Sequence, residues 1–156
     1  MLQDFYREKL ASLLSHQAAA RFVGQYDINN TYQYIVNREE TQLSWVAVAI
    51  TELGATPDDN VPEPERTTAG KGPGRTSVLF EEDTRDAQAF VDRWQPRVEA
   101  MTNARHRGML RVILGEALEQ KRFFEQARAG EKELLGRRGK EAGERVGEVL
   151  PERWIE

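Results

Sequence analysis

The chain has 156 residues, a formal net charge of −4 and a hydrophobic fraction of 39%, which suits one domain with one core. A mildly acidic chain has no overall positive field to attract nucleic acid or an anionic membrane, so neither is expected as a partner. The sequence has no cysteine and only two histidines, His16 and His106, which excludes disulfides, thiolate metal sites and a zinc site built from several histidines.

Residues 3–24 predict a first helix, because they contain no proline and are rich in alanine, leucine, glutamine and arginine. One stripe of this helix carries four residues at helical spacing: Leu10, Leu13, Gln17 and Ala20. Gly24 is expected to stop the helix.

Residues 30–53 predict the second helix. Its inner stripe carries six residues: Ile35, Glu39, Gln42, Val46, Ala49 and Leu53. Gly54 closes this helix, and Pro57 follows just beyond it. Two helices joined by so short a turn are expected to lie antiparallel, as an αα-hairpin.

Residues 56–77 predict a long crossover loop, since they hold four of the chain's six prolines and show no apolar periodicity. Within them, GKGPGRTS (70–77) partly resembles a phosphate-binding loop. It lacks the full G-x-x-x-x-G-K-[ST] pattern and no predicted strand precedes it, so a linker is the favoured interpretation. The helical pattern resumes near Asp83, which places the loop at 56–82.

Two further helices are predicted, over residues 84–102 and 104–128. Pro96 is expected to kink or interrupt the first of them, because proline removes a backbone donor. The inner stripe of the second helix carries Leu110, Ile113, Ala117, Gln120 and Phe124. Gly130 is expected to end it.

The predicted fold is all-α: an antiparallel four-helix bundle over residues 1–130, made of two αα-hairpins joined by a long crossover loop. An irregular C-terminal tail follows over 131–156, with a short surface helix near 140–149. No stretch reaches the roughly 20 apolar residues of a membrane span. The mixed charges of the first residues, MLQDFYREKL, do not resemble a signal peptide, so a cytoplasmic protein is expected.

Four polar side chains fall on stripes predicted to face the core: Gln17, Glu39, Gln42 and Gln120. Burying an amide or a carboxylate without a partner is costly. Three interpretations therefore stay open: the stripes are rotated so that these groups reach solvent, the groups form a buried polar network, or they bind a metal ion. His106, flanked by two arginines, is expected to be exposed.

Two segments resemble ferritin-like proteins of the bacterioferritin and rubrerythrin type. Residues 32–57, YQYIVNREETQLSWVAVAITELGATP, are similar to the second helix of that family, and residues 109–124, MLRVILGEALEQKRFF, to its fourth. The resemblance implies a ferritin-like bundle. It places the family's two Glu-x-x-His metal-binding pairs on these residues: Glu39 and Gln42, Ala117 and Gln120. Only Glu39 keeps its ligand type, so a degenerate di-iron site without ferroxidase or peroxidase chemistry is implied.

The leading functional hypothesis is a non-enzymatic structural or partner-binding bundle, without a cofactor and forming a homodimer. The alternative is a metal-binding oxidoreductase or iron-handling protein. Its iron or manganese would be held by a shifted carboxylate site made of four residues: Glu39, His16, Glu116 and Glu119. A small-molecule pocket lined by Trp45 and Trp94 is a third possibility, although both tryptophans fit helix packing better.

Overall fold

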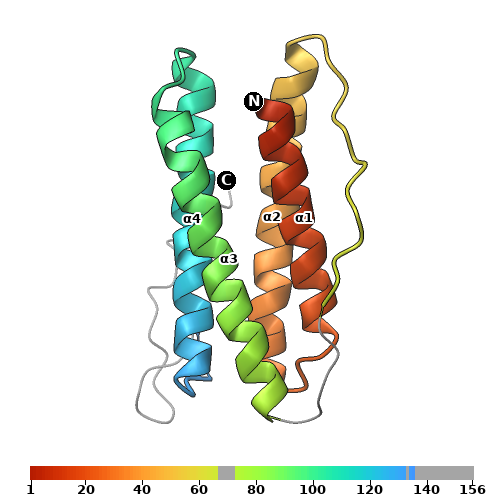
Figure 1. The fold of residues 1–156 in the computed structure, drawn as a ribbon, viewed down its shortest axis with the longest axis vertical. Coiled ribbons are helices and arrows are strands. Elements are labelled where there is room, and N and C mark those ends of the chain that lie inside the picture. The colour runs from red at the N-terminus through yellow and green to blue at the C-terminus, as the bar shows by residue number, and fades with distance from the viewer. Residues whose placement is uncertain (67–72, 133, 136–156) are drawn as a thin grey trace, which may run out of the picture.

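The computed structural model describes residues 1–66, 73–132 and 134–135, which form four helices and no strand (Figure 1). The helices are α1 (Leu2–Ala20), α2 (Tyr26–Glu52), α3 (Pro73–Glu99) and α4 (Ala104–Arg128). The prediction of an all-α bundle of four helices is thus confirmed for this part of the chain. None of its helices combines the length and the apolar character needed to cross a membrane.

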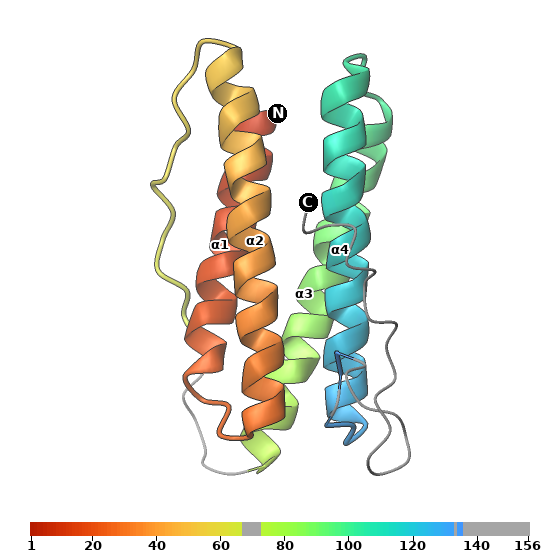
Figure 2. The same ribbon diagram turned by 180° about the vertical axis from the view of Figure 1, so that it is seen from behind.

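The helices pack chiefly as two pairs, α1 with α2 and α3 with α4, and contacts between the pairs are fewer. A short turn joins the two helices of each pair, which lie side by side in both views (Figures 1 and 2). Residues 53–66, which we call the strap, leave α2 and run along the outside of the first pair (Figure 1). The strap therefore covers part of the surface that a bare helical hairpin would expose.

Side chains of α1 hold the strap in place. The amide of Gln3 donates a hydrogen bond of 2.5 Å to the backbone carbonyl of Thr56. One turn further along, the hydroxyl of Tyr6 donates to a carboxylate oxygen of Asp59 at 2.6 Å. Because contacts repeat along the helix, the strap is fixed in register against α1.

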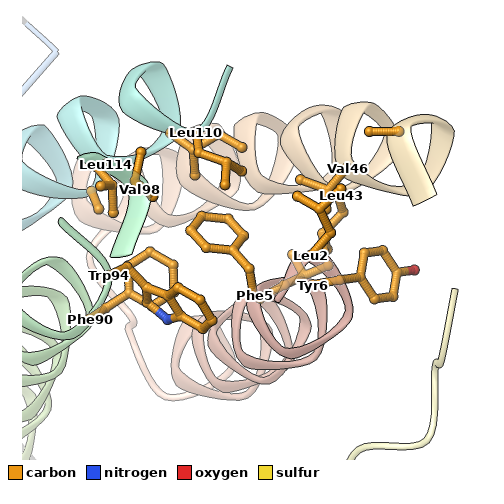
Figure 3. Close-up of a cluster of buried hydrophobic side chains, with 14 of the residues drawn as sticks. Leu2, Phe5, Tyr6, Leu43, Val46, Phe90, Trp94, Val98, Leu110 and Leu114 are labelled. Atoms are coloured by element: carbon orange, nitrogen blue, oxygen red, sulfur yellow. The ribbon is translucent and has the colours of Figure 1, made fainter. Parts of the chain in front are cut away.

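The apolar core consists of two clusters, one toward each end of the bundle. In the larger cluster, the ring centroid of Phe5 lies 5.3 Å from that of Phe90 and 4.9 Å from that of Trp94, both edge-to-face. Figure 3 shows Phe5 pointing inward among side chains of the other helices. The smaller cluster includes Tyr32 and Phe124. Between the clusters, all four helices contribute polar side chains to a central layer.

Three helix boundaries differ from the prediction by four residues or more. Helix α1 ends at Ala20 rather than at 24, and α2 begins at Tyr26 rather than at 30. Helix α3 begins at Pro73 rather than at 84, so the loop predicted over 56–82 is shorter. Proline suits the first turn of a helix, where its missing N–H has no helical acceptor.

The residues before Asp83 belong to α3 because they continue its apolar stripe. Leu79 and Phe80 are 1% and 4% exposed. Taken alone, residues 77–80 look like a strand that is too short to form. Their packing against the other helices stabilises them as the first turns of a helix, which the short apolar run could not show by itself.

Two local features differ from expectation. Of the kink or interruption expected at Pro96, the interruption does not occur, because α3 continues to Glu99. The carbonyl left without its helical donor is that of Asp92, an exposed residue, where water can satisfy it. His106 is buried, not exposed, because it lies one turn before Leu110 on the inner stripe of α4.

Glycines end α2 and α4 as predicted. Gly54 and Gly130 have φ values of 79° and 90°, a region that favours glycine. Of the predicted tail, Leu134 is buried against the smaller cluster. The short helix expected near 140–149 lies outside the described residues.

Candidate functional site

The central polar layer is built around Glu39, which lies on α2 and is 0% exposed. Its Oε1 accepts a hydrogen bond from the Nζ of Lys9 at 2.7 Å, and its Oε2 accepts one from the Nδ1 of His16 at 2.8 Å. Lys9 and His16 both lie on α1 and are themselves buried. Both oxygens of Glu39 are thus engaged by cationic or hydrogen-bonding side chains of one helix.

A second buried carboxylate, Asp83 of α3, continues the layer. One of its oxygens accepts from the Arg66 guanidinium of the strap, and the other from the Tyr32 hydroxyl of α2. The Nε2 of His16 lies 4.0 Å from Asp83 Oδ1. His16 therefore lies between two carboxylates, Glu39 and Asp83.

We call these six side chains the charged centre: Lys9, His16, Tyr32, Glu39, Arg66 and Asp83. Glu82 also contacts Arg66, at 3.3 Å. With His16 protonated, the centre holds three cations against the two carboxylates of Glu39 and Asp83, and the neighbouring Glu82 supplies the third negative charge that balances them. Balance matters here because an uncompensated buried charge costs several kcal/mol.

The pKa values reflect this pairing. Burial alone would raise the pKa of Glu39, but the charges of His16 and Lys9 lower it to about 2. Burial alone would lower the pKa of His16, but Glu39 and Asp83 together raise it above its ordinary value. Burial and the neighbouring Asp83 raise the pKa of Tyr32 well above its ordinary value. Glu39 is therefore ionised, and Tyr32 keeps its proton, across the physiological range.

A cavity of about 460 Å³ opens onto the charged centre. Its inner wall includes Lys9, His16, Glu39, Asp83 and Gln120. Its outer wall is formed by residues 62–65 of the strap and by α3 residues that include Asp86, Phe90 and Arg93. We call this space the mid-bundle cavity, and it connects the charged centre with the surface.

The four residues of the predicted polar network, Gln17, Glu39, Gln42 and Gln120, belong to different groups of contacts in the structure. Glu39, Gln42 and Gln120 are buried at 0%, 0% and 5% exposure, whereas Gln17 is half-buried. Gln42 donates through Nε2 to Glu116 at 2.5 Å, and Glu116 also pairs with Arg38. Glu39 instead belongs to the charged centre, and Gln120 faces the cavity.

The four residues of the predicted shifted metal site also separate into different groups. His16 and Glu39 meet at 2.8 Å. Glu116 is engaged by Arg38 and Gln42, and Glu119 contacts Arg122 on the helix surface at 3.5 Å. In the part of the chain that the structure describes, no group of three or more histidine and carboxylate side chains is arranged to hold a metal ion.

The donor chemistry at the mapped ligand positions does not fit a di-iron centre. Lys9 occupies Glu39 Oε1, where a metal would have to bind. Ala117 has no donor atom, and Gln42 directs its amide nitrogen toward a carboxylate. Of the four mapped positions, only Glu39 offers iron a carboxylate and none offers an imidazole, so the donor set of a di-iron centre is incomplete.

Four members of the charged centre are absent from the sites predicted from the sequence: Lys9, Tyr32, Arg66 and Asp83. Lys9 carried a signal, because it lies four residues from both Phe5 and Leu13 on the inner face of α1. A lysine on that stripe requires a buried carboxylate, and Glu39 was the candidate. Arg66 carried no such signal, because its partner depends on where the strap crosses the bundle.

The tryptophans do not line the mid-bundle cavity. Trp94 is 1% exposed, packs against Phe5 and donates through Nε1 to Glu8 at 2.9 Å. Trp45 is half-buried on α2, with the Arg38 guanidinium 5.9 Å from its ring centroid. Both therefore contribute to packing, the role that their spacing favours.

Comparison of the chain with models of protein families, with characterised proteins and with solved structures finds no match. The function is therefore argued from the site alone.

Proposed function

We propose that this chain is a non-enzymatic, ferritin-like antiparallel bundle that binds a small organic cation in the mid-bundle cavity. The observation that carries the proposal is the cavity itself, which reaches from the surface to a charged centre whose ionised groups already have partners. The long connection between the two helix pairs supports the ferritin-like assignment, as does the position of Glu39 at mid-height.

The charged centre supports binding rather than catalysis. A general base needs a pKa near the working pH, whereas the pKa of Glu39 is about 2. Tyr32 keeps its proton and donates a hydrogen bond to Asp83. Glu39 and Tyr32 therefore belong to a fixed polar wall that a ligand meets, and neither is ready to exchange a proton with it.

The charge of the outer wall favours a cation. Three carboxylates lie at the cavity's opening: Glu63 and Glu65 on the strap and Asp86 on α3. All three residues are exposed, so the field that they create extends into solvent. The ring of Phe90 and several alanine methyl groups line the space behind them. An amine attached to a short apolar chain matches both features, since an aromatic face also attracts cations.

Calorimetric titration of the full chain with α,ω-diaminoalkanes of increasing length tests the proposal. We expect saturable binding with an optimum chain length, and no binding of the matched neutral diols. Glu65→Gln should weaken the binding by roughly tenfold, a change of about 1.4 kcal/mol. Glu40→Gln removes the same charge from an exposed position on α2 outside the cavity, and should leave the affinity unchanged.

Equal affinity for diamines and diols would overturn the cationic ligand class. Failure of the whole amine series to bind would overturn the proposed function. An equal effect of Glu65→Gln and Glu40→Gln would show that only the overall charge of the protein matters.

The homodimer expected from the sequence is also part of this proposal. Val48 of α2 and Val112 of α4 are 55% and 51% exposed. They lie between the Arg105–Glu52 and Arg38–Glu116 ion pairs that link these two helices. A second copy could cover this apolar strip, and sedimentation velocity would give the mass of the assembly.

A further inference from the structure

A second cavity, of about 590 Å³, lies at the end of the bundle where the α1–α2 turn, the start of α3 and the end of α4 meet. We call it the end cavity, and it shares no lining residue with the mid-bundle cavity. Its apolar wall comes from Phe22, Phe80 and Ala127. Phe80 and Ala127 are buried, so this wall is part of the folded core and not a loose surface.

The charged side chains of the end cavity are mostly cationic. Among the described residues that line it, three carry a positive charge, Arg75, Arg128 and Lys132, and one carries a carboxylate, Glu131. The whole chain has a net charge of −4. Cationic side chains thus gather at this cavity of an acidic chain, and cations lining a concave, partly apolar space favour an anion.

The surroundings of two of these cations suit the binding of an anionic ligand. The guanidinium of Arg75 lies 3.8 Å from the ring centroid of Phe22, and stacking on the ring fixes the plane of the guanidinium. Arg128 contacts Glu81 at 3.4 Å with more than half of its side chain exposed, and such surface pairs are worth about 0–1 kcal/mol. A bound anion can therefore compete for Arg128 at little cost.

Hydroxyl groups add neutral donors to this set. Thr76 and Ser77 line the end cavity next to Arg75. These three residues close the GKGPGRTS segment, whose pattern is too incomplete for a phosphate-binding loop. In the folded chain their side chains join Arg128 and Lys132 from the end of α4, which no sequence pattern shows.

We propose that the end cavity binds a small molecule carrying a phosphate group on an aromatic or apolar body. Arginine presents paired N–H donors that match phosphate oxygens, and hydroxyls complete such a shell. The apolar wall formed by Phe22, Phe80 and Ala127 would contact the body of the ligand. This site is independent of the diamine site proposed above.

The test uses the full chain at constant ionic strength, so that screening does not change between samples. Phenyl phosphate, inorganic phosphate and phenol are titrated by calorimetry, and amide shifts are followed by NMR. We expect saturable binding of phenyl phosphate, binding at least about tenfold weaker for each of the other two, and shifts concentrated at Phe22, Thr76 and Ser77.

Arg75→Gln and Arg128→Gln should each weaken phenyl phosphate binding by roughly tenfold. Arg105→Gln is the matched control, because Arg105 lies at the other end of α4 and is mostly exposed. Circular dichroism verifies that each variant is folded, and the second cavity variant keeps the test valid if the first does not fold.

Three results would overturn the proposal: no saturable binding of phenyl phosphate, equal affinity for phenyl phosphate and inorganic phosphate, or equal weakening by Arg105→Gln. Equal affinity would show that free phosphate alone is recognised and that the apolar wall contributes nothing.

Discussion

Glu39 is the residue on which the chemistry of the bundle centre depends. Its carboxylate is 0% exposed, and each oxygen accepts one short hydrogen bond, from Lys9 or from His16. Removing one partner of a buried ion pair lowers the free energy of unfolding by more than the net attraction of the pair. The reason is that the remaining charge stays buried without compensation. Lys9 therefore compensates the buried charge of Glu39.

Lys9→Met tests this role. We expect the free energy of unfolding to fall by about 3–5 kcal/mol, because Glu39 is left with His16 alone. The double variant Lys9→Met/Glu39→Gln should recover part of this loss, since a neutral amide needs no counter-charge. Urea denaturation followed by circular dichroism measures both changes.

The matched surface variant is Arg105→Gln, which breaks an exposed pair with Glu52 and should cost less than about 1 kcal/mol. If Lys9→Met costs no more than this control, the lysine does not compensate Glu39 in solution.

The strap illustrates how one element links the others. Near its beginning it is held to α1 by Gln3 and Tyr6, and at Arg66 it reaches Asp83 of α3. Arg66 also donates to the backbone carbonyl of Ser15 at 3.3 Å. The strap thus closes the outer wall of the mid-bundle cavity, and one of its side chains belongs to the charged centre.

Arg66→Gln and Tyr6→Phe should separate the two attachments of the strap. Arg66→Gln removes a charge partner of buried Asp83, so we expect a loss of about 3 kcal/mol in unfolding free energy. Tyr6→Phe removes one partly exposed hydrogen bond and should cost about 1 kcal/mol. Hydrogen exchange of strap amides should accelerate near residue 66 in the first variant and near Asp59 in the second.

Equal stability losses, or exchange that accelerates along the whole strap in both variants, would contradict this division. The strap would then detach as one unit, and Arg66 would contribute no more than a surface contact.

At the scale of the whole molecule, the charged centre connects the two helix pairs. The pairs make fewer contacts with each other than the helices make within a pair. The centre joins α1, α2, α3 and the strap through buried ion pairs and hydrogen bonds. Protonation of this layer therefore affects how the pairs are held together, and stability should depend on pH.

The sign of this dependence follows from the two pKa shifts. The pKa of Glu39 is lowered from 4.5 to about 2, so its contribution, on the order of 3 kcal/mol, is present above pH 4.5 and lost as pH falls toward 2. The pKa of His16 is raised above 6.5. Its contribution is fully present below pH 6.5 and is lost as pH rises through the raised value.

Urea denaturation over a pH series measures both the acid and the alkaline loss of stability. His16→Gln should abolish the alkaline fall in stability, whereas His106→Gln, which changes the other histidine, should leave it in place. A stability profile that is flat above pH 6.5 in the unmodified chain would contradict the charged form of His16.

Features that depend on neighbouring residues could be predicted from the amino-acid sequence. Helical periodicity predicted four helices, glycines predicted the ends of α2 and α4, and the stripe containing Ile35 and Val46 predicted that Glu39 and Gln42 face inward. These are local properties, because a helix places residues three and four apart on one face whatever surrounds it.

Which charged side chains meet depends on the three-dimensional packing and could not be predicted. The partners in the charged centre are 30 residues apart for Lys9 and Glu39, and 51 for Tyr32 and Asp83. Each pairing depends on the rotation and relative height of two helices, and Arg66 depends on the path of the strap. The same holds for the two cavities, because the side chains that line them come from segments with no common pattern in the sequence.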